Sequence, residues 1–201
     1  MTEQHKIITF LDQERWPLLE MESMICSMPQ NSDDEQVIAY MDQILNDLND
    51  QAAGLAAIQV GYPRRIFMLR NGRDLNGNVF NNVYINPVLT NISRTKKLDV
   101  EACLSIPGMQ TAFPRPKSVT LQYQNISGDI VTEEFIGFWA RAVMHEMDHL
   151  NGVLITKHAS LVERESRTSF GMVLSPHRLK VIERRRAKKK RAKLARRKGR
   201  N

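Results

Sequence analysis

The sequence predicts an α+β fold in which antiparallel strands pack around a central helix. Apolar residues recur from Val37 to Leu48 at the spacing of one helix face. Five β-branched or aromatic segments follow, separated by turn residues. A further stretch without Pro or Gly, Phe138–Leu150, reads as a second helix. The order helix, strands, helix is typical of α+β domains.

The amino-terminal part is expected to contain a short strand and one helix. Lys6–Phe10 has strand character, and Met28–Ser32 interrupts the chain. Ser32 or Asp33 is the expected N-cap of the helix, which should end near Asp50.

The expected strands lie in the middle of the chain. They cover residues 65–69, 83–85, 88–100, 119–123 and 130–135. Asn86-Pro87 is interpreted as a break between two of them. Leu161–Leu174 reads as a weaker helix beyond the central one.

The charge of the chain is unevenly distributed, which predicts two parts. Arg178–Asn201 holds 14 of the 29 Lys and Arg residues and one acid, a local charge of +13. The rest of the chain therefore carries −6 of the net +7. We expect one globular domain over residues 1–175 and a basic extension, helix or tail, over residues 176–201.

Cysteine usage and hydropathy indicate a cytoplasmic protein. Cys26 and Cys103 are the two cysteines, which is no disulfide framework and fits a reducing compartment. Met1–Arg15 contains no apolar stretch of the kind found in signal peptides. No run approaches the roughly 18 apolar residues of a membrane span, so no membrane partner is expected.

The central helix carries the motif with the most chemical content, His145-Glu146-Met147-Asp148-His149. Histidines at positions i and i+4 leave the same helix face and can bind one metal ion. Glu146 lies beside that face, where it can accept a proton from a water on the metal. A solvated surface helix is the alternative interpretation of so short a motif.

A catalytic metal usually has a third protein ligand. His158 and His177 are candidates without a supporting context. Cys103, at the end of an expected strand, would complete a compact Cys-His-His site, although a lone Cys is more often a buried structural thiol.

Three blocks taken together resemble the peptide deformylase family. They are Ala52-Ala53-Gly54-Leu55-Ala56-Ala57-Ile58-Gln59, Glu101-Ala102-Cys103-Leu104-Ser105 and Met144-His145-Glu146-Met147-Asp148-His149. The family carries Gly-x-Gly-Leu-Ala-Ala-x-Gln, Glu-Gly-Cys-Leu-Ser and Gln-His-Glu-x-Asp-His in the same order. The resemblance covers roughly residues 34–175.

The resemblance implies hydrolysis of the formyl group from N-formylmethionyl nascent peptides by a monomeric enzyme. Cys103, His145 and His149 would hold Fe²⁺, with Zn²⁺, Ni²⁺ or Co²⁺ as possible substitutes. Glu146 would move the proton, while the Gln59 side chain and the Leu104 backbone N–H would stabilise the oxyanion. The expected substrate-binding residues are Gly54, Leu55, Glu101, Leu104 and Arg141.

The chain departs from the family pattern at four positions. Ala52 and Ala102 replace glycines, so each added methyl would crowd the pocket or strain the loop. Met144 replaces Gln. Arg141 replaces an apolar pocket residue, where a guanidinium would either cap the pocket or favour an acidic substrate group. Asp148 is expected to orient a ligand, to pair with Arg115, or to be solvated.

Two other classes of protein account for part of the sequence. A metalloprotease shares His-Glu-x-x-His, but its third ligand is normally a downstream His or Glu. A ribosome- or RNA-binding protein with a degenerate site would explain the tail and the Gly-to-Ala changes. It would not explain why the catalytic set is retained.

The basic extension has no apolar face to bury against the domain. Its charge and its place in the family predict ribosome binding through phosphate contacts, and a solvated extension is the alternative. The residues expected to contact nucleic acid are Arg184, Arg185, Arg186, Lys188, Lys189, Lys190 and Arg191.

Overall fold

Antiparallel strands surround one central helix, as the sequence predicted. In the computed structural model of the chain, the described residues are 7–73, 75–76 and 78–158. Within them, the five-stranded sheet has the order β1-β2-β3-β6-β7, and β4 and β5 form a separate two-stranded sheet. All pairings between these strands are antiparallel. Among the described residues, no helix combines the length and the apolar character needed to cross a membrane.

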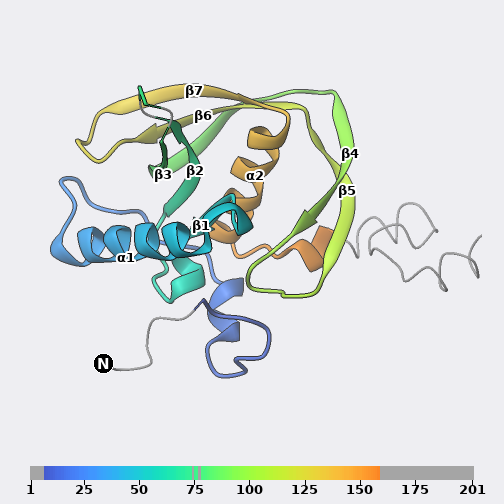
Figure 1. Ribbon diagram of the computed structural model, residues 1–201, viewed down its shortest axis with the longest axis horizontal. Helices are drawn as coiled ribbons and strands as arrows, with labels where there is room; N and C mark the ends of the chain where they lie inside the picture. The colour runs from blue at the N-terminus through green and yellow to red at the C-terminus, as the bar shows by residue number, and fades with distance from the viewer. Residues whose placement is uncertain (1–6, 74, 77, 159–201) are drawn as a thin grey trace, which may run out of the picture.

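The central helix α2, Phe138–Leu150, lies between the two sheets (Figure 1). It contacts β1, β2, β6 and β7 of the larger sheet and β5 of the smaller one. The strands are β1 (Gly54–Ala56), β2 (Ile66–Arg73), β3 (Val79–Ile92), β4 (Lys96–Ala102), β5 (Gln110–Pro116), β6 (Ser118–Gln124) and β7 (Ile130–Ile136).

The amino-terminal helix α1, Ser32–Leu48, packs against the same sheet through Val37, Met41 and Leu45. The expected N-cap was wrong by one residue, because the side chain of Asn31 accepts the hydrogen bond from the Asp34 N–H. The helix ends at Leu48 and continues as the 3₁₀ turn η2, Asn49–Gln51. Two other 3₁₀ turns are η1, Trp16–Glu20, and η3, Ala57–Val60.

Three strand predictions in the middle of the chain were wrong, two of them at prolines. The expected strand over residues 88–100 is divided, because β3 ends at Ile92 and β4 begins at Lys96 in the other sheet. The expected break at Asn86-Pro87 is a register shift within β3, because Asn86 takes a positive φ of 50° and the pairing resumes at Val88. Strand β5 was missed because it contains Pro114 and Pro116. These prolines are two residues apart, so both missing N–H groups face one edge of a strand whose one partner among the described strands is β4.

Residues 7–10 do not form the expected strand. They lie as an extended arm, whose Ile8 N–H donates to the Gln59 backbone carbonyl and whose Phe10 N–H donates to the Ser105 carbonyl. The predicted helix at 161–174, His177 and the basic extension lie outside the described residues.

Candidate metal centre

Helix α2 presents the two histidines of the motif on one face. The helix begins after Gly137, which has φ 64°. It ends at Leu150, as predicted, and Asn151 and Gly152 follow it. Glu146 and His149 are buried, with 4% and 1% of their surface exposed. Most residues of this helix are buried, and Glu146 and His149 face the interior and not solvent.

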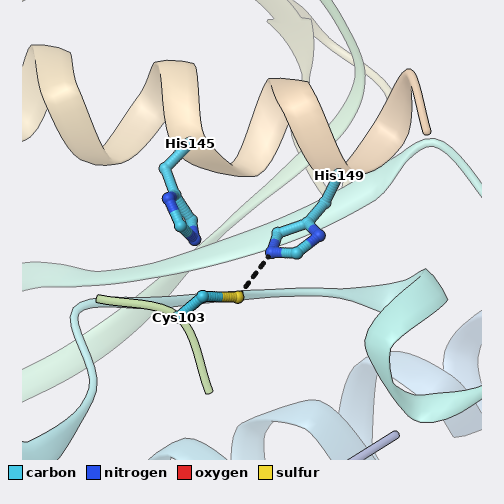
Figure 2. A group of neighbouring side chains, drawn as sticks. All are labelled: Cys103, His145 and His149. Atoms are coloured by element: carbon cyan, nitrogen blue, oxygen red, sulfur yellow. Dashed lines mark hydrogen bonds between the residues drawn. The ribbon is translucent and has the colours of Figure 1, made fainter. Parts of the chain in front are cut away.

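The thiol of Cys103 faces both imidazoles from the loop that follows β4 (Figure 2). Cys103 Sγ lies 3.2 Å from His149 Nε2. The thiol and one ring nitrogen from each of His145 and His149 all lie within 4.8 Å of one another. These three residues thus form a compact Cys-His-His group, and the structure brings together the set expected from the sequence.

Gln59 is held beside this group in one orientation. Its side-chain carbonyl accepts a hydrogen bond from the Ala56 N–H at 2.9 Å. Its amide nitrogen therefore points towards the site, 3.1 Å from Ser105 Oγ and 3.9 Å from Cys103 Sγ. Within the described residues, the Leu104 N–H makes no hydrogen bond. The Gln59 amide is thus directed at the Cys-His-His group, and the Leu104 N–H is a second donor near it.

Glu101 is the residue shared by a network of buried charged side chains next to the Cys-His-His group. Its carboxylate accepts two hydrogen bonds from Arg115, at 2.6 and 2.9 Å, and one from Arg141 at 2.6 Å. It also lies 3.0 Å from His145 Nδ1. The Glu101 carboxylate favours a proton on Nδ1, so Nε2 is the nitrogen that would offer its lone pair to a metal ion.

The pKa of Glu101 reflects these contacts. Burial opposes ionisation, but the hydrogen bonds from Arg115 and His145 outweigh it and lower the pKa to about 2 from 4.5. Glu101 is therefore ionised at neutral pH, and its position is fixed by three positively charged or polar partners.

Asp148 extends the network away from the site. It pairs with Arg115 at 2.8 Å, which confirms the predicted pairing, and lies 2.7 Å from His158 Nε2. His158 also stacks on the Phe113 ring at 4.5 Å between centroids. His158 thus supports Asp148 and, in the described residues, does not belong to the group of possible metal ligands.

Burial perturbs the titration of the helix residues. Burial raises the pKa of Glu146 to about 7. The charge of His145 opposes this rise, and the negative charge of Glu101 adds to it. Burial and the neighbouring His145 lower the pKa of His149 well below its usual value. Within the described residues, Glu146 Oε2 and His149 Nδ1 are buried without a hydrogen-bond partner.

A cavity of about 310 Å³ opens onto the site. Its lining includes Gly54, Gln59, Glu101, Cys103, Leu104, Phe138, Arg141, Ala142, His145 and Glu146. The backbone at Gly54 approaches Glu146 so closely that an added Cβ would lie 2.7 Å from its carboxylate oxygen. Leu55 does not line this cavity; its side chain is fully buried in the core under α1. Any contact of Leu55 with substrate would therefore involve its backbone.

The family glycines replaced by alanine cause no backbone strain. Ala52 has φ −134°, and Ala102 is not among the described residues with positive φ. Both methyl groups line the cavity, so crowding and not strain is their possible effect. Met144 packs into the main hydrophobic core.

The sequence reasoning missed two contributors to the site. Ser105 holds the Gln59 amide, and Arg115 binds Glu101 as well as Asp148. Ser105 belongs to the Cys103 block, so its position in that block was the available signal. Nothing local to Arg115 indicated its second partner.

A His-Glu-x-x-His helix whose two histidines lie close to a thiol, beside an open cavity, is the arrangement expected of a metal-dependent hydrolase. A family model described as polypeptide deformylase matches residues 11–165 of the chain. The chain belongs to this family, so the family prediction and the predicted α+β class are confirmed. The family is metal-dependent, and the Cys-His-His group is a possible metal site in this chain.

Individual relatives agree with this assignment. The peptide deformylase of Caulobacter vibrioides is 37% identical over 143 residues, covering 69% of this chain and 80% of that protein. That of Agrobacterium fabrum is 38% identical over 136 residues, or 66% of this chain and 78% of that protein. The crystal structure of peptide deformylase from Thermotoga maritima matches with TM-score 0.65 and 31% identity, covering 78% of this chain and 98% of that one.

Proposed function

We propose that this protein is a metal-dependent hydrolase that removes the formyl group from N-formylmethionyl peptides and releases formate. The observation that carries the proposal is the buried Cys103, His145 and His149 group with Glu146 beside it, in a chain of the deformylase family. The reaction adds water to the formyl carbon and breaks its bond to the methionine nitrogen.

The residues present fit a transition-metal ion. One thiolate and two imidazoles are ligands of borderline softness, and they meet within 4.8 Å. Glu101 fixes the tautomer of His145, as a hydrogen-bonded carboxylate does for many metal-binding histidines. We propose Fe²⁺ as the native ion, with Zn²⁺, Ni²⁺ or Co²⁺ as substitutes. When bound, the ion would activate water and polarise the formyl oxygen.

Glu146 is the proposed general base and general acid. Its carboxylate is buried at the cavity, and its pKa near 7 suits a group that both accepts and releases a proton at neutral pH. It would take the proton of the attacking water and deliver it to the departing amine nitrogen.

The Gln59 amide and the Leu104 N–H are the proposed oxyanion donors. The Ala56 N–H fixes the Gln59 amide with its nitrogen towards Cys103, and the Leu104 N–H has no partner in the described residues. Donors held in place before the reaction stabilise the developing charge without reorganisation. Gly54, Glu101, Leu104 and Arg141 line the cavity and are the proposed substrate-binding residues.

The geometry favours this function over a metalloprotease. Cys103 occupies the place of the third ligand, while the downstream His158 is bonded to Asp148. A degenerate binding protein is disfavoured because Glu146, Gln59 and the Cys-His-His group all face one cavity.

Formate release tests the proposal. The Fe²⁺-loaded protein, kept anaerobic, should release formate from formyl-Met-Ala-Ser and leave acetyl-Met-Ala-Ser intact. Glu146→Gln, matched in size, should retain the metal and lose activity by about 10²- to 10⁴-fold. A metal-loaded wild type without formate release would refute the proposal.

We also propose that residues 176–201 bind the ribosome and that the monomeric enzyme acts in the cytoplasm, where formylated chains emerge. Support comes from the sequence alone, since this extension lies outside the described residues and carries a local charge of +13 from Arg178. Truncation after Ser175 should preserve turnover of a short peptide and abolish salt-sensitive co-sedimentation with ribosomes. Equal co-sedimentation of both forms would contradict this.

A further inference from the structure

Three residues form a wall between the catalytic cavity and a second cavity. The second cavity, of about 140 Å³, lies where β4 and β5 meet the start of α2. Val100, Phe138 and Arg141 line both cavities. Lys117 lines only the second one. The catalytic cavity therefore ends at a wall of side chains with further space behind it.

Arg141 is the fixed part of this wall. Its Nη1 donates to Glu101 Oε1 at 2.6 Å and lies within 3.4 Å of two backbone carbonyl oxygens, those of Asp99 and Phe113. Its Nη2 donates to the Lys97 carbonyl at 2.7 Å. The residue is 8% exposed. Its charge is thus already neutralised, which favours a capping role over the binding of an acidic substrate group.

The helix geometry places this wall at the distance of a substrate side chain. Arg141 lies one turn before His145 on α2, and a turn rises about 5.4 Å. A formyl carbon held at the Cys-His-His group would place the side chain of the adjacent residue in the catalytic cavity, which Arg141 and Phe138 also line. An unbranched side chain of methionine length that extended along this cavity towards the wall would end near the guanidinium.

We propose that Arg141 limits the length of the substrate side chain by closing the catalytic cavity against the second one. This inference rests on the proposed function. A longer apolar chain would have to displace the Arg141 guanidinium from Glu101 and from the Phe113 and Lys97 carbonyl groups, which would leave a buried cation without these partners. Removing the guanidinium would join the two cavities and admit the longer chain.

A series of formyl-X-Ala-Ser peptides with linear alkyl side chains tests the inference. The measured quantity is the ratio of kcat/KM for X = 2-aminooctanoate to that for X = norleucine. The wild type should disfavour the longer residue. Arg141→Leu should raise the ratio by about tenfold, because two added methylenes gain buried space. The change should fall mainly on KM, which a general loss of structure would not produce.

Matched variants make the result decisive. Arg141→Lys keeps a long cation and should raise the ratio less than Arg141→Leu. Lys117→Met changes only the second cavity and should leave the ratio at the wild-type value. If Arg141→Leu does not fold, Arg141→Gln decides in its place, because its shorter side chain also removes the guanidinium while its amide can still donate to a backbone carbonyl of this wall.

Two negative outcomes are distinguishable. A wild type that releases formate, with a ratio unchanged within twofold in folded Arg141→Leu or Arg141→Gln, overturns the inference alone. An equal rise in Lys117→Met also overturns it, because the wall would then not separate the cavities. A wild type that releases no formate from any peptide removes the proposed function and the inference with it.

Discussion

Replacing Glu101 by Gln tests the buried network in the most quantitative way. Glu101 is 6% exposed and accepts charged hydrogen bonds from Arg115 and Arg141. Glutamine keeps the shape of the side chain but removes the carboxylate that pairs with both guanidinium groups, and Arg115 keeps its pair with Asp148. Removing one partner of a buried ion pair costs about 3–5 kcal/mol.

The pKa of Glu101 gives a second measure of the same effect. Its fall to about 2 from 4.5 corresponds to about 3 kcal/mol of stabilisation by the ionised carboxylate. We therefore expect Glu101→Gln to lower the free energy of unfolding by about 3 kcal/mol at pH 7. The corresponding fall in Tm is about 6–12 °C for a domain of this size.

The sign of the pH dependence follows from the direction of the shift. A carboxyl whose pKa is depressed on folding stabilises fully above its unfolded value of 4.5 and loses that contribution as the pH falls towards 2. The difference between wild type and Glu101→Gln should therefore be largest at pH 7 and shrink below pH 4.5.

Urea denaturation in EDTA measures the difference without a contribution from metal affinity. Glu134→Gln is the matched control, because Glu134 is exposed on β7 and should change stability by less than about 0.5 kcal/mol. A loss below about 1 kcal/mol for Glu101→Gln at pH 7, or a difference independent of pH, would refute the reasoning.

Three other substitutions or reactions probe the site and the core. Gln59→Ala should lower kcat by about 10²- to 10³-fold with unchanged metal content, because one oriented oxyanion donor is lost; normal turnover would exclude that role. Gly54→Ala should impair turnover while the protein stays folded, since the added Cβ would lie 2.7 Å from Glu146 Oε1 and 2.9 Å from the Met68 carbonyl oxygen; wild-type kinetics would contradict the tight packing. Burial raises the pKa of Cys26 to about 11, so iodoacetamide at pH 8 should spare it in the folded protein; peptide mapping that finds rapid modification would show that it is accessible.

The parts of the fold that follow from local sequence were predictable. Helix α2 was predicted over its observed range, because Phe138–Leu150 contains no Pro or Gly. The spacing of His145 and His149 within that helix fixed their common face. Cys103, the third member of the Cys-His-His group, was predicted from the family resemblance of its block and not from local geometry.

The network around Glu101 was not predictable because it depends on tertiary pairing. Arg141 reaches Glu101 across 40 residues of sequence, and His145 does so across 44. The sequence left open whether the Arg141 guanidinium closes the cavity or binds substrate. The answer depends on its hydrogen bonds to carbonyl groups of β4 and β5. Strand β5 itself was missed, since its two prolines read as loop residues until the one-sided pairing with β4 is known.

X-ray absorption of the metal-loaded protein most directly tests the claim that Cys103, His145 and His149 together hold the catalytic ion. The wild type loaded with one equivalent of Zn²⁺ should show one sulfur neighbour together with nitrogen or oxygen neighbours. In Cys103→Ser the sulfur contribution should vanish and the ion should be held less tightly. A wild-type spectrum without sulfur, or one unchanged in Cys103→Ser, would contradict the assignment.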